Sequence, residues 1–188
     1  MPELNAKITL KSKGEEAYVA VKQLMVTLKW TADVDLDLMA FYRAKDGRTG
    51  AVISDNYPGG SLGSLNAFPY ILLSGDAGIE AAGGDNVEEL RIAELDDLEA
   101  VYICAVNYTD ASKSINSKFA DYDGGVIVTD DKGESIGVPL DSAEEGHVAV
   151  IARLDNSGMM GPKLVNENKI MDLRTFVNTV PGASAIIG

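Results

Sequence analysis

The ten residues from Thr31 to Ala40 read T-A-D-V-D-L-D-L-M-A. Three aspartates, Asp33, Asp35 and Asp37, alternate in this stretch with apolar side chains. Alternation with a period of two predicts a β-strand that buries one face. The other face would carry carboxylates about 7 Å apart, and like charges in one row repel each other. The stretch therefore predicts a strand and also a place where positive charge is needed.

This positive charge is not supplied by the neighbouring sequence. No Lys or Arg lies between Lys29 and Arg43. Carboxylate oxygens without a nearby His or Cys are typical ligands of Ca²⁺ or Mg²⁺. The stretch is not an EF-hand loop, because Leu38 and Ala44 stand where that loop needs a glycine and a bidentate glutamate. These residues alone are consistent with two interpretations, a bound cation and a solvated acidic strand face.

The composition indicates an acidic globular chain. It has 188 residues, 46% of them hydrophobic, which is enough for one sizeable core. There are 16 Lys and Arg against 29 Asp and Glu, so the formal net charge is -13. Such a charge repels nucleic acid and anionic membranes, and we expect neither as a partner. It favours cations or basic protein surfaces.

Other features lead us to expect a soluble cytoplasmic protein. The first residues lack the apolar core of a signal peptide. No apolar run reaches the ~20 residues of a membrane span. The single cysteine, Cys104, excludes an internal disulfide and lies in the apolar run V-Y-I-C-A-V. We expect this thiol to be buried and inert.

Short apolar segments separated by turn signals predict the fold class. Asp46-Gly47 and Asp130 to Gly133 are typical of tight hairpin turns. Many short strands with little helical periodicity favour a mainly β protein, a two-sheet antiparallel β-sandwich. The predicted strands cover 7–10, 24–30, 36–42, 51–54, 68–73, 101–106, 124–129, 136–140 and 147–154, with one more starting at 90.

The C-terminal region has a different pattern. Apolar residues at helical spacing predict one amphipathic helix from about Asn166 to Thr179, lying on the sandwich or on a partner. Asn166 or Asn168 would cap its start, and Pro181-Gly182 would end it.

Several acidic motifs occur in a recognisable order. D-V-D-L-D at 33–37 is followed by D-N at 55–56 and by S-G-D at 74–76. G-G-D-N-V-E-E at 83–89 and the apolar run at 101–106 come next. This order and spacing resemble the tellurium-resistance TerD family from about Trp30 to Tyr108.

The resemblance implies a β-sandwich that binds one or two Ca²⁺ ions through loops clustered at one end. It also implies a role in tellurite resistance or a broader stress response, with no family-wide catalytic activity. We expect calcium to order the acidic loops into a surface for a partner or ligand. The positions that match the family's metal-binding motifs are Asp35, Asp37, Asp55, Asn56, Asp76, Asp85 and Glu88.

The chain also departs from the family pattern. Ala77 stands where the family's turn usually has Asn, and I-E-A-A at 79–82 replaces part of an acidic run. The sequence after Leu154 does not match the usual ending. We expect a single domain over 1–188, in which 156–188 is a less typical tail that contains the helix.

Two other functions are consistent with parts of the sequence. Ser61 lies in G-G-S-L-G, the pattern of a nucleophile elbow, and His147 could serve as its base in a small serine hydrolase. That elbow needs a following helix, which residues 64–69 do not favour. The third possibility is a passive oligomerisation module in which the C-terminal helix docks on a protein partner or a second copy.

Overall fold

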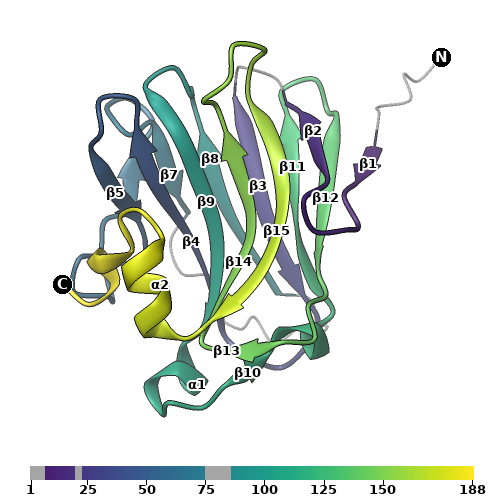
Figure 1. Ribbon diagram of the computed structural model, residues 1–188, viewed down its shortest axis with the longest axis vertical. Helices are drawn as coiled ribbons and strands as arrows, with labels where there is room; N and C mark the ends of the chain where they lie inside the picture. Colours follow the sequence, from purple (N-terminus) through teal and green to yellow (C-terminus); the bar gives the residue numbers. More distant parts are fainter. Residues whose placement is uncertain (1–6, 20–22, 75–85) are drawn as a thin grey trace.

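The computed structural model describes residues 7–19, 23–74 and 86–188. Figure 1 shows two β-sheets packed face to face, with short helices beside one sheet and at one end. The predicted two-sheet sandwich is confirmed. None of the helices in the described ranges is long and apolar enough to cross a membrane.

Within the described residues, the first sheet has seven strands in the order β1-β12-β11-β3-β8-β7-β6. Only β1 and β12 pair in parallel, and the other neighbours are antiparallel. The strands are β1 (Lys7–Thr9), β12 (Ser135–Leu140), β11 (Gly124–Asp130), β3 (Leu24–Trp30), β8 (Asn86–Ile92), β7 (Ile71–Leu73) and β6 (Gly63–Ser64).

The second sheet is antiparallel throughout, in the order β2-β15-β14-β9-β4-β5. A two-stranded ribbon, β10 (Ser117–Lys118) with β13 (Glu145–Gly146), lies at one end together with α1 (Tyr108–Ser112) and the 3-10 helix η1 (Phe119–Tyr122). The strands of the second sheet are β2 (Glu16–Tyr18), β15 (Lys163–Met171), β14 (Val148–Asp155), β9 (Leu98–Asn107), β4 (Leu36–Ala44) and β5 (Thr49–Val52).

Alternating apolar residues form the core between the sheets. Val26 and Leu28 of β3 and Leu90 of β8 face Leu38 and Ile103 of the other sheet, and all five are buried. The Asp-Gly turns also form as predicted: Asp46-Gly47 connects β4 to β5, and Gly47 has a φ of 93° that suits glycine.

The strand β4 is buried on both faces, contrary to the one-sided burial predicted from its alternation. Its outward-facing Met39 and Phe41 pack against Phe176 of α2 (Leu173–Thr179) and Ile186 of the 3-10 helix η2 (Ala183–Ile186). The Phe41 and Phe176 rings meet edge to face, with centroids 5.0 Å apart. The C-terminal segment thus covers this strand, as Figure 1 shows.

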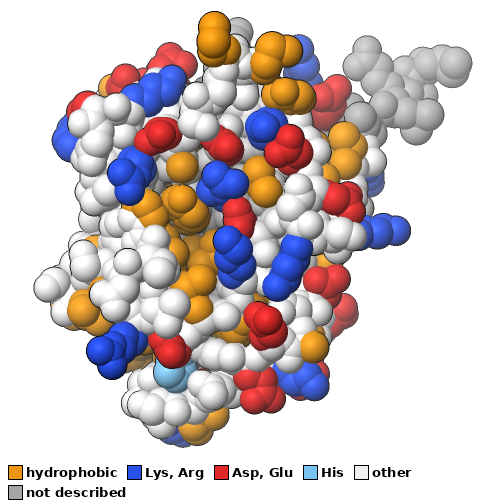
Figure 2. Space-filling view, in the orientation of Figure 1, with side chains coloured by type: hydrophobic (Ala, Val, Ile, Leu, Met, Phe, Trp, Pro, Cys, Tyr) orange, Lys and Arg blue, Asp and Glu red, His pale blue; other side chains and the backbone are white. Residues whose placement is uncertain are grey.

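Charged side chains occupy the part of this outer face that α2 leaves open (Figure 2). Arg153 of β14 donates a 2.9 Å hydrogen bond to Glu167 of β15, and Lys169 lies 3.1 Å from the same carboxylate. The six-stranded sheet therefore has an apolar outer region under the C-terminal segment and a solvated, ion-paired region beside it.

The predicted start of the C-terminal helix at Asn166 is wrong. Asn166 and Asn168 belong to β15, where their side-chain amides donate to the carbonyl oxygens of Leu10 and Pro139. These bonds tie β15 to the opposite sheet, so strand pairing prevails over the local helical spacing. The helix begins at Leu173, and the Asp172 carboxylate caps it by accepting from the backbone of Thr175.

The packing of α2 on β4 yields the first prediction. Phe176→Ala should lower the free energy of unfolding by about 3–5 kcal/mol, because it removes a fully buried ring and leaves a cavity over Phe41. Urea unfolding followed by circular dichroism measures this change. Asn178→Ala, on the exposed side of the same helix, should change it by less than about 0.5 kcal/mol. Equal effects of the two substitutions would contradict this packing.

Candidate metal centre

Three carboxylates from different parts of the chain converge at one end of the sandwich. Asp35 directly precedes β4, Asp37 is its second residue, and Glu88 is the third residue of β8. One oxygen of each lies within 4.8 Å of the others. Asp37 is 8% exposed and Glu88 4% exposed, so two of the three side chains are buried.

The topology explains why these residues meet. Trp30, the last residue of β3, pairs with Asn86, the first residue of β8. The chain then crosses to the other sheet through residues 31–35 and enters β4, where Leu36 pairs with Asn107 at the end of β9. The start of β4 and the start of β8 therefore lie at the same end of the sandwich. The Asn86 amide donates to the Ala32 carbonyl oxygen at 3.0 Å and holds the crossing segment there.

The Glu88 carboxylate accepts a backbone hydrogen bond from β4 at a position where β5 does not pair with this strand. The edge strand β5 pairs with β4 only from Ala40 to Arg43. The earlier residues of β4 have no β5 residue opposite them, and the Leu38 N–H donates instead to Glu88 Oε2 at 2.6 Å. A short bond from a backbone N–H to an ionised carboxylate is strong. It fixes Glu88 beside the aspartates although they belong to different sheets.

Tyr57 holds the second carboxylate. Its phenol donates to Asp37 Oδ2 at 2.5 Å. Burial, reinforced by the Asp37 charge and by this bond, raises the pKa of Tyr57 well above its ordinary value. Tyr57 therefore stays neutral and acts as a hydrogen-bond donor at physiological pH.

A cavity of about 340 Å³ opens beside the cluster and is lined by Asp35, Asp37, Asn56 and Tyr108. The Tyr108 ring meets the Tyr57 ring edge to face, with centroids 5.9 Å apart. The side chains here offer carboxylate, amide and phenolic oxygens, and no His or Cys is among the residues that line the cavity. Such hard oxygen donors fit a divalent cation of the calcium or magnesium type. The cluster can therefore hold a metal ion.

The predicted ligands fall into three groups. Asp35, Asp37 and Glu88 come together, and Asn56 lines the same cavity. Asp55 is exposed in the adjoining turn and is not part of the carboxylate cluster. Asp76 and Asp85 lie outside the described residues.

Two local predictions about this region are wrong. Residues 31–35 form a connection between the sheets, so Asp33 is exposed and does not continue a strand face with the other aspartates. Glu88, predicted within an acidic loop, lies in β8 on the face that also carries the buried Leu90.

Sequence reasoning missed the two tyrosines at this site. Tyr57 follows Asp55-Asn56 and precedes Pro58-Gly59-Gly60, in an otherwise polar turn. An aromatic residue in such a turn is a signal of anchoring, because solvent-exposed turns rarely need one.

The local structure around Ser61 and His147 differs from that of a serine hydrolase. Ser61 forms a β-bridge with Ile53 and is followed by β6, whereas a nucleophile elbow needs a helix after the serine. His147 Nδ1 accepts a hydrogen bond from the Leu173 backbone. Among the hydrogen bonds of the described residues, none joins Ser61 to His147.

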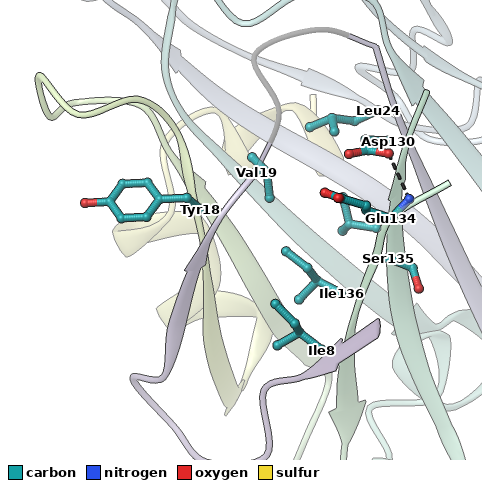
Figure 3. Close-up of a pocket in the computed structure, with 9 residues that line it drawn as sticks. Ile8, Tyr18, Val19, Leu24, Asp130, Glu134, Ser135 and Ile136 are labelled. Atoms are coloured by element: carbon teal, nitrogen blue, oxygen red, sulfur yellow. Dashed lines mark hydrogen bonds between the residues drawn. The ribbon is translucent and has the colours of Figure 1, made fainter. Parts of the chain in front are cut away.

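A second cavity is lined by apolar side chains together with Asp130, Glu134 and Ser135, and it is smaller than the cavity at the carboxylate cluster. It holds about 50 Å³ between β1, β2 and the β11–β12 hairpin. Figure 3 shows Ile8, Val19 and Ile136 around it, while the Tyr18 ring points away. The Asp130 carboxylate at its rim accepts from the Glu134 backbone at 2.9 Å and so serves the hairpin turn.

The contact between Glu88 and Leu38 yields a prediction for the metal-free protein. In the presence of a chelator, Glu88→Ala should lower the free energy of unfolding by about 1–3 kcal/mol, because it leaves the buried Leu38 N–H without an acceptor. Glu88→Gln keeps an acceptor oxygen and should lose less. Urea unfolding in EDTA measures both. Equal losses would show that the charge of Glu88, and not this hydrogen bond, contributes the stability.

Comparison with known proteins supports the fold. No protein-family profile matches the chain, and no curated protein sequence matches it. A solved structure of a telluride-resistance protein (TerD) homologue from Streptomyces coelicolor A3(2) is similar, with a TM-score of 0.54 and 19% identity. The match covers 89% of this chain and 96% of that one.

A second solved structure, SAV2460, described as a protein of unknown function, has a TM-score of 0.55 and 14% identity. It matches over 80% of this chain and 92% of its own length. At these identities the similarity concerns the fold. The chain therefore has a TerD-like β-sandwich fold, with an acidic cluster at one end that can hold a metal ion.

Proposed function

We propose that this protein binds Ca²⁺ through Asp35, Asp37 and Glu88. The observation that carries the proposal is the convergence of these carboxylates from two sheets to within 4.8 Å. Like charges this close repel one another, and the repulsion is stronger where side chains are buried. A divalent cation at the cluster offsets that repulsion and links β4 to β8.

The proposed ion is calcium rather than magnesium. Calcium accepts six to eight oxygens in irregular geometry, whereas magnesium demands a near-ideal octahedron and keeps several waters. The cluster supplies carboxylates, and Asn56 adds an amide oxygen at the same cavity. Asp76 and Asp85 are candidates for the remaining positions, on the basis of the sequence motifs alone.

The ends of the acidic segment that holds Asp76 and Asp85 lie next to the cluster. The Ser74 N–H and hydroxyl both donate to the Glu89 carbonyl oxygen, at 3.0 and 2.7 Å. Glu89 directly follows Glu88, so Ser74, at the start of the acidic segment, is hydrogen-bonded to the residue after a proposed ligand. Calcium would then order the segment between Ser74 and Asn86 into a surface for a protein partner or ligand. The TerD-like fold supports assigning this binding to a tellurite-resistance or stress-response role.

Calorimetric titration of Ca²⁺ into chelator-treated protein tests the proposal. The unaltered protein should show saturable binding at one or two sites, and Asp37→Asn should weaken binding at least about tenfold by removing a ligand charge. Asp33→Asn is the matched control, because it removes the same charge from the same motif at an exposed position outside the cluster. It should leave the affinity unchanged within about twofold. Magnesium at equal concentration should bind more weakly.

Two outcomes would count against the proposal. Absence of saturable binding to the unaltered protein would show that the cluster is a structural feature without a metal-binding role. Equal weakening by Asp33→Asn and Asp37→Asn would show only a general effect of net charge.

Calcium should also order the acidic segment and stabilise the fold. Hydrogen exchange of the amides between Ser74 and Asn86 should slow when calcium is added, and the free energy of unfolding should rise by about 2.7 kcal/mol at a concentration 100 times Kd. In Asp37→Asn at the same calcium concentration, a tenfold loss of affinity should reduce the stabilisation to about 1.4 kcal/mol and slow the exchange less. Unchanged exchange between Ser74 and Asn86, despite saturable binding, would refute the ordering step.

A further inference from the structure

We infer that Tyr57 is a positioning residue for the metal cluster and that the C-terminal segment, residues 172–188, holds Tyr57 in place. The inference rests on the proposed calcium binding and adds a means of regulating it. Its basis is a continuous set of contacts from the carboxylate of Asp37 to the helix η2.

The first contact is the hydrogen bond from the Tyr57 phenol to Asp37 Oδ2, 2.5 Å long. It occupies one carboxylate oxygen and restricts rotation of the group. Oriented carboxylates bind metal ions more tightly, because the protein does not have to order them during binding. Tyr57 therefore acts on the ion through Asp37.

The second contact is made by the ring of Tyr57. It packs against the apolar cluster that contains Phe41, Phe176 and Ile186. Two of these residues belong to the C-terminal segment. The same side chain thus reaches the acidic cluster with its hydroxyl, and with its ring the apolar cluster to which the C-terminal segment contributes.

The third contact joins the backbone of this turn to η2. The Gly59 N–H donates to the Ala185 carbonyl oxygen at 2.9 Å. A Cβ on Gly59 would lie 2.3 Å from that oxygen, so only glycine allows so close an approach. Within the turn, the Tyr57 N–H donates to the Ser54 carbonyl oxygen, and the Gly60 N–H donates to that of Tyr57. The turn is therefore fixed internally and seated on the C-terminal segment.

Asp37 itself lies on the strand face that this segment covers. Residues 37, 39 and 41 alternate outward along β4, and Met39 and Phe41 pack beneath α2 and η2. Removal of the segment would expose this face and release the turn that carries Tyr57. Calcium affinity and docking of the segment are thus coupled, and such coupling is reciprocal: calcium should favour docking by the factor by which docking favours calcium.

The experiment compares Tyr57→Phe with the unaltered protein. The substitution keeps the ring and its packing and removes only the hydroxyl. Calcium affinity should fall up to about tenfold, because the Asp37 carboxylate then has to be ordered during binding. Tyr18→Phe is the control, because Tyr18 is exposed on β2 and should leave the affinity unchanged.

Hydrogen exchange of the amides in 183–188 supplies a second readout that simple loss of stability would not reproduce. In the unaltered protein, saturating calcium should slow this exchange. In Tyr57→Phe, saturating calcium should slow it much less. Gly59→Ala, which crowds Ala185 but keeps the phenol, should weaken calcium binding and speed exchange in 183–188.

The outcomes separate the inference from the function on which it rests. If the unaltered protein binds no calcium, both are overturned. If it binds calcium and Tyr57→Phe binds equally well, the positioning role of Tyr57 alone is overturned. If Tyr57→Phe binds more weakly but calcium does not change exchange in 183–188 of the unaltered protein, the role of the C-terminal segment is overturned.

Discussion

Burial of β4 on both faces is the constraint on which the rest of the structure depends. Its inner face contributes Leu36, Leu38 and Ala40 to the core between the sheets. Its outer face is apolar as well and requires the cover that α2 and η2 provide. Asp37 is a buried polar exception in this strand. A carboxylate in such a place needs specific interactions, because burying a charge without them is costly.

The unequal lengths of neighbouring strands create the opportunity for a binding site. Because β5 ends opposite Ala40, the first residues of β4 keep free the edge on which Glu88 accepts the Leu38 N–H. A longer β5 would pair with this edge and exclude the glutamate. The site therefore arises where sheet pairing stops, while the crossing segment 31–35 brings Asp35 from the other direction.

Much of the fold follows from short-range patterns in the sequence. Alternation in 24–30 and the turn at Asp46-Gly47 are enough to predict a strand and a hairpin, because both depend on neighbouring residues. The start of the C-terminal helix is not predictable in this way. Asn166 and Asn168 are held in β15 by bonds to Leu10 and Pro139, which are distant in sequence.

At the candidate site, too, some residues are predictable from local sequence motifs, whereas others are placed by contacts between distant parts of the chain. The D-x-D motif marks Asp35 and Asp37, but it equally marks Asp33, which is exposed. Glu88 resembles a loop residue by type, because glutamate is rare at buried strand positions. Its place in β8 follows from pairing with β3, and its orientation follows from the unpaired edge of β4. Tyr57 carries no motif, and only the folded chain shows its bond to Asp37.

The C-terminal region has two separable structural roles. The strand β15 lies inside the six-stranded sheet between β2 and β14, so residues 163–171 are part of the sandwich itself. Residues 172–188 contribute no strand to either sheet and instead pack on β4 and on the turn at Gly59. Changes in the second part can alter the support of Asp37 without altering the order of the strands. Sequence divergence in this segment is therefore compatible with a shared TerD-like fold, because the segment packs on the outer face of β4 without entering either sheet.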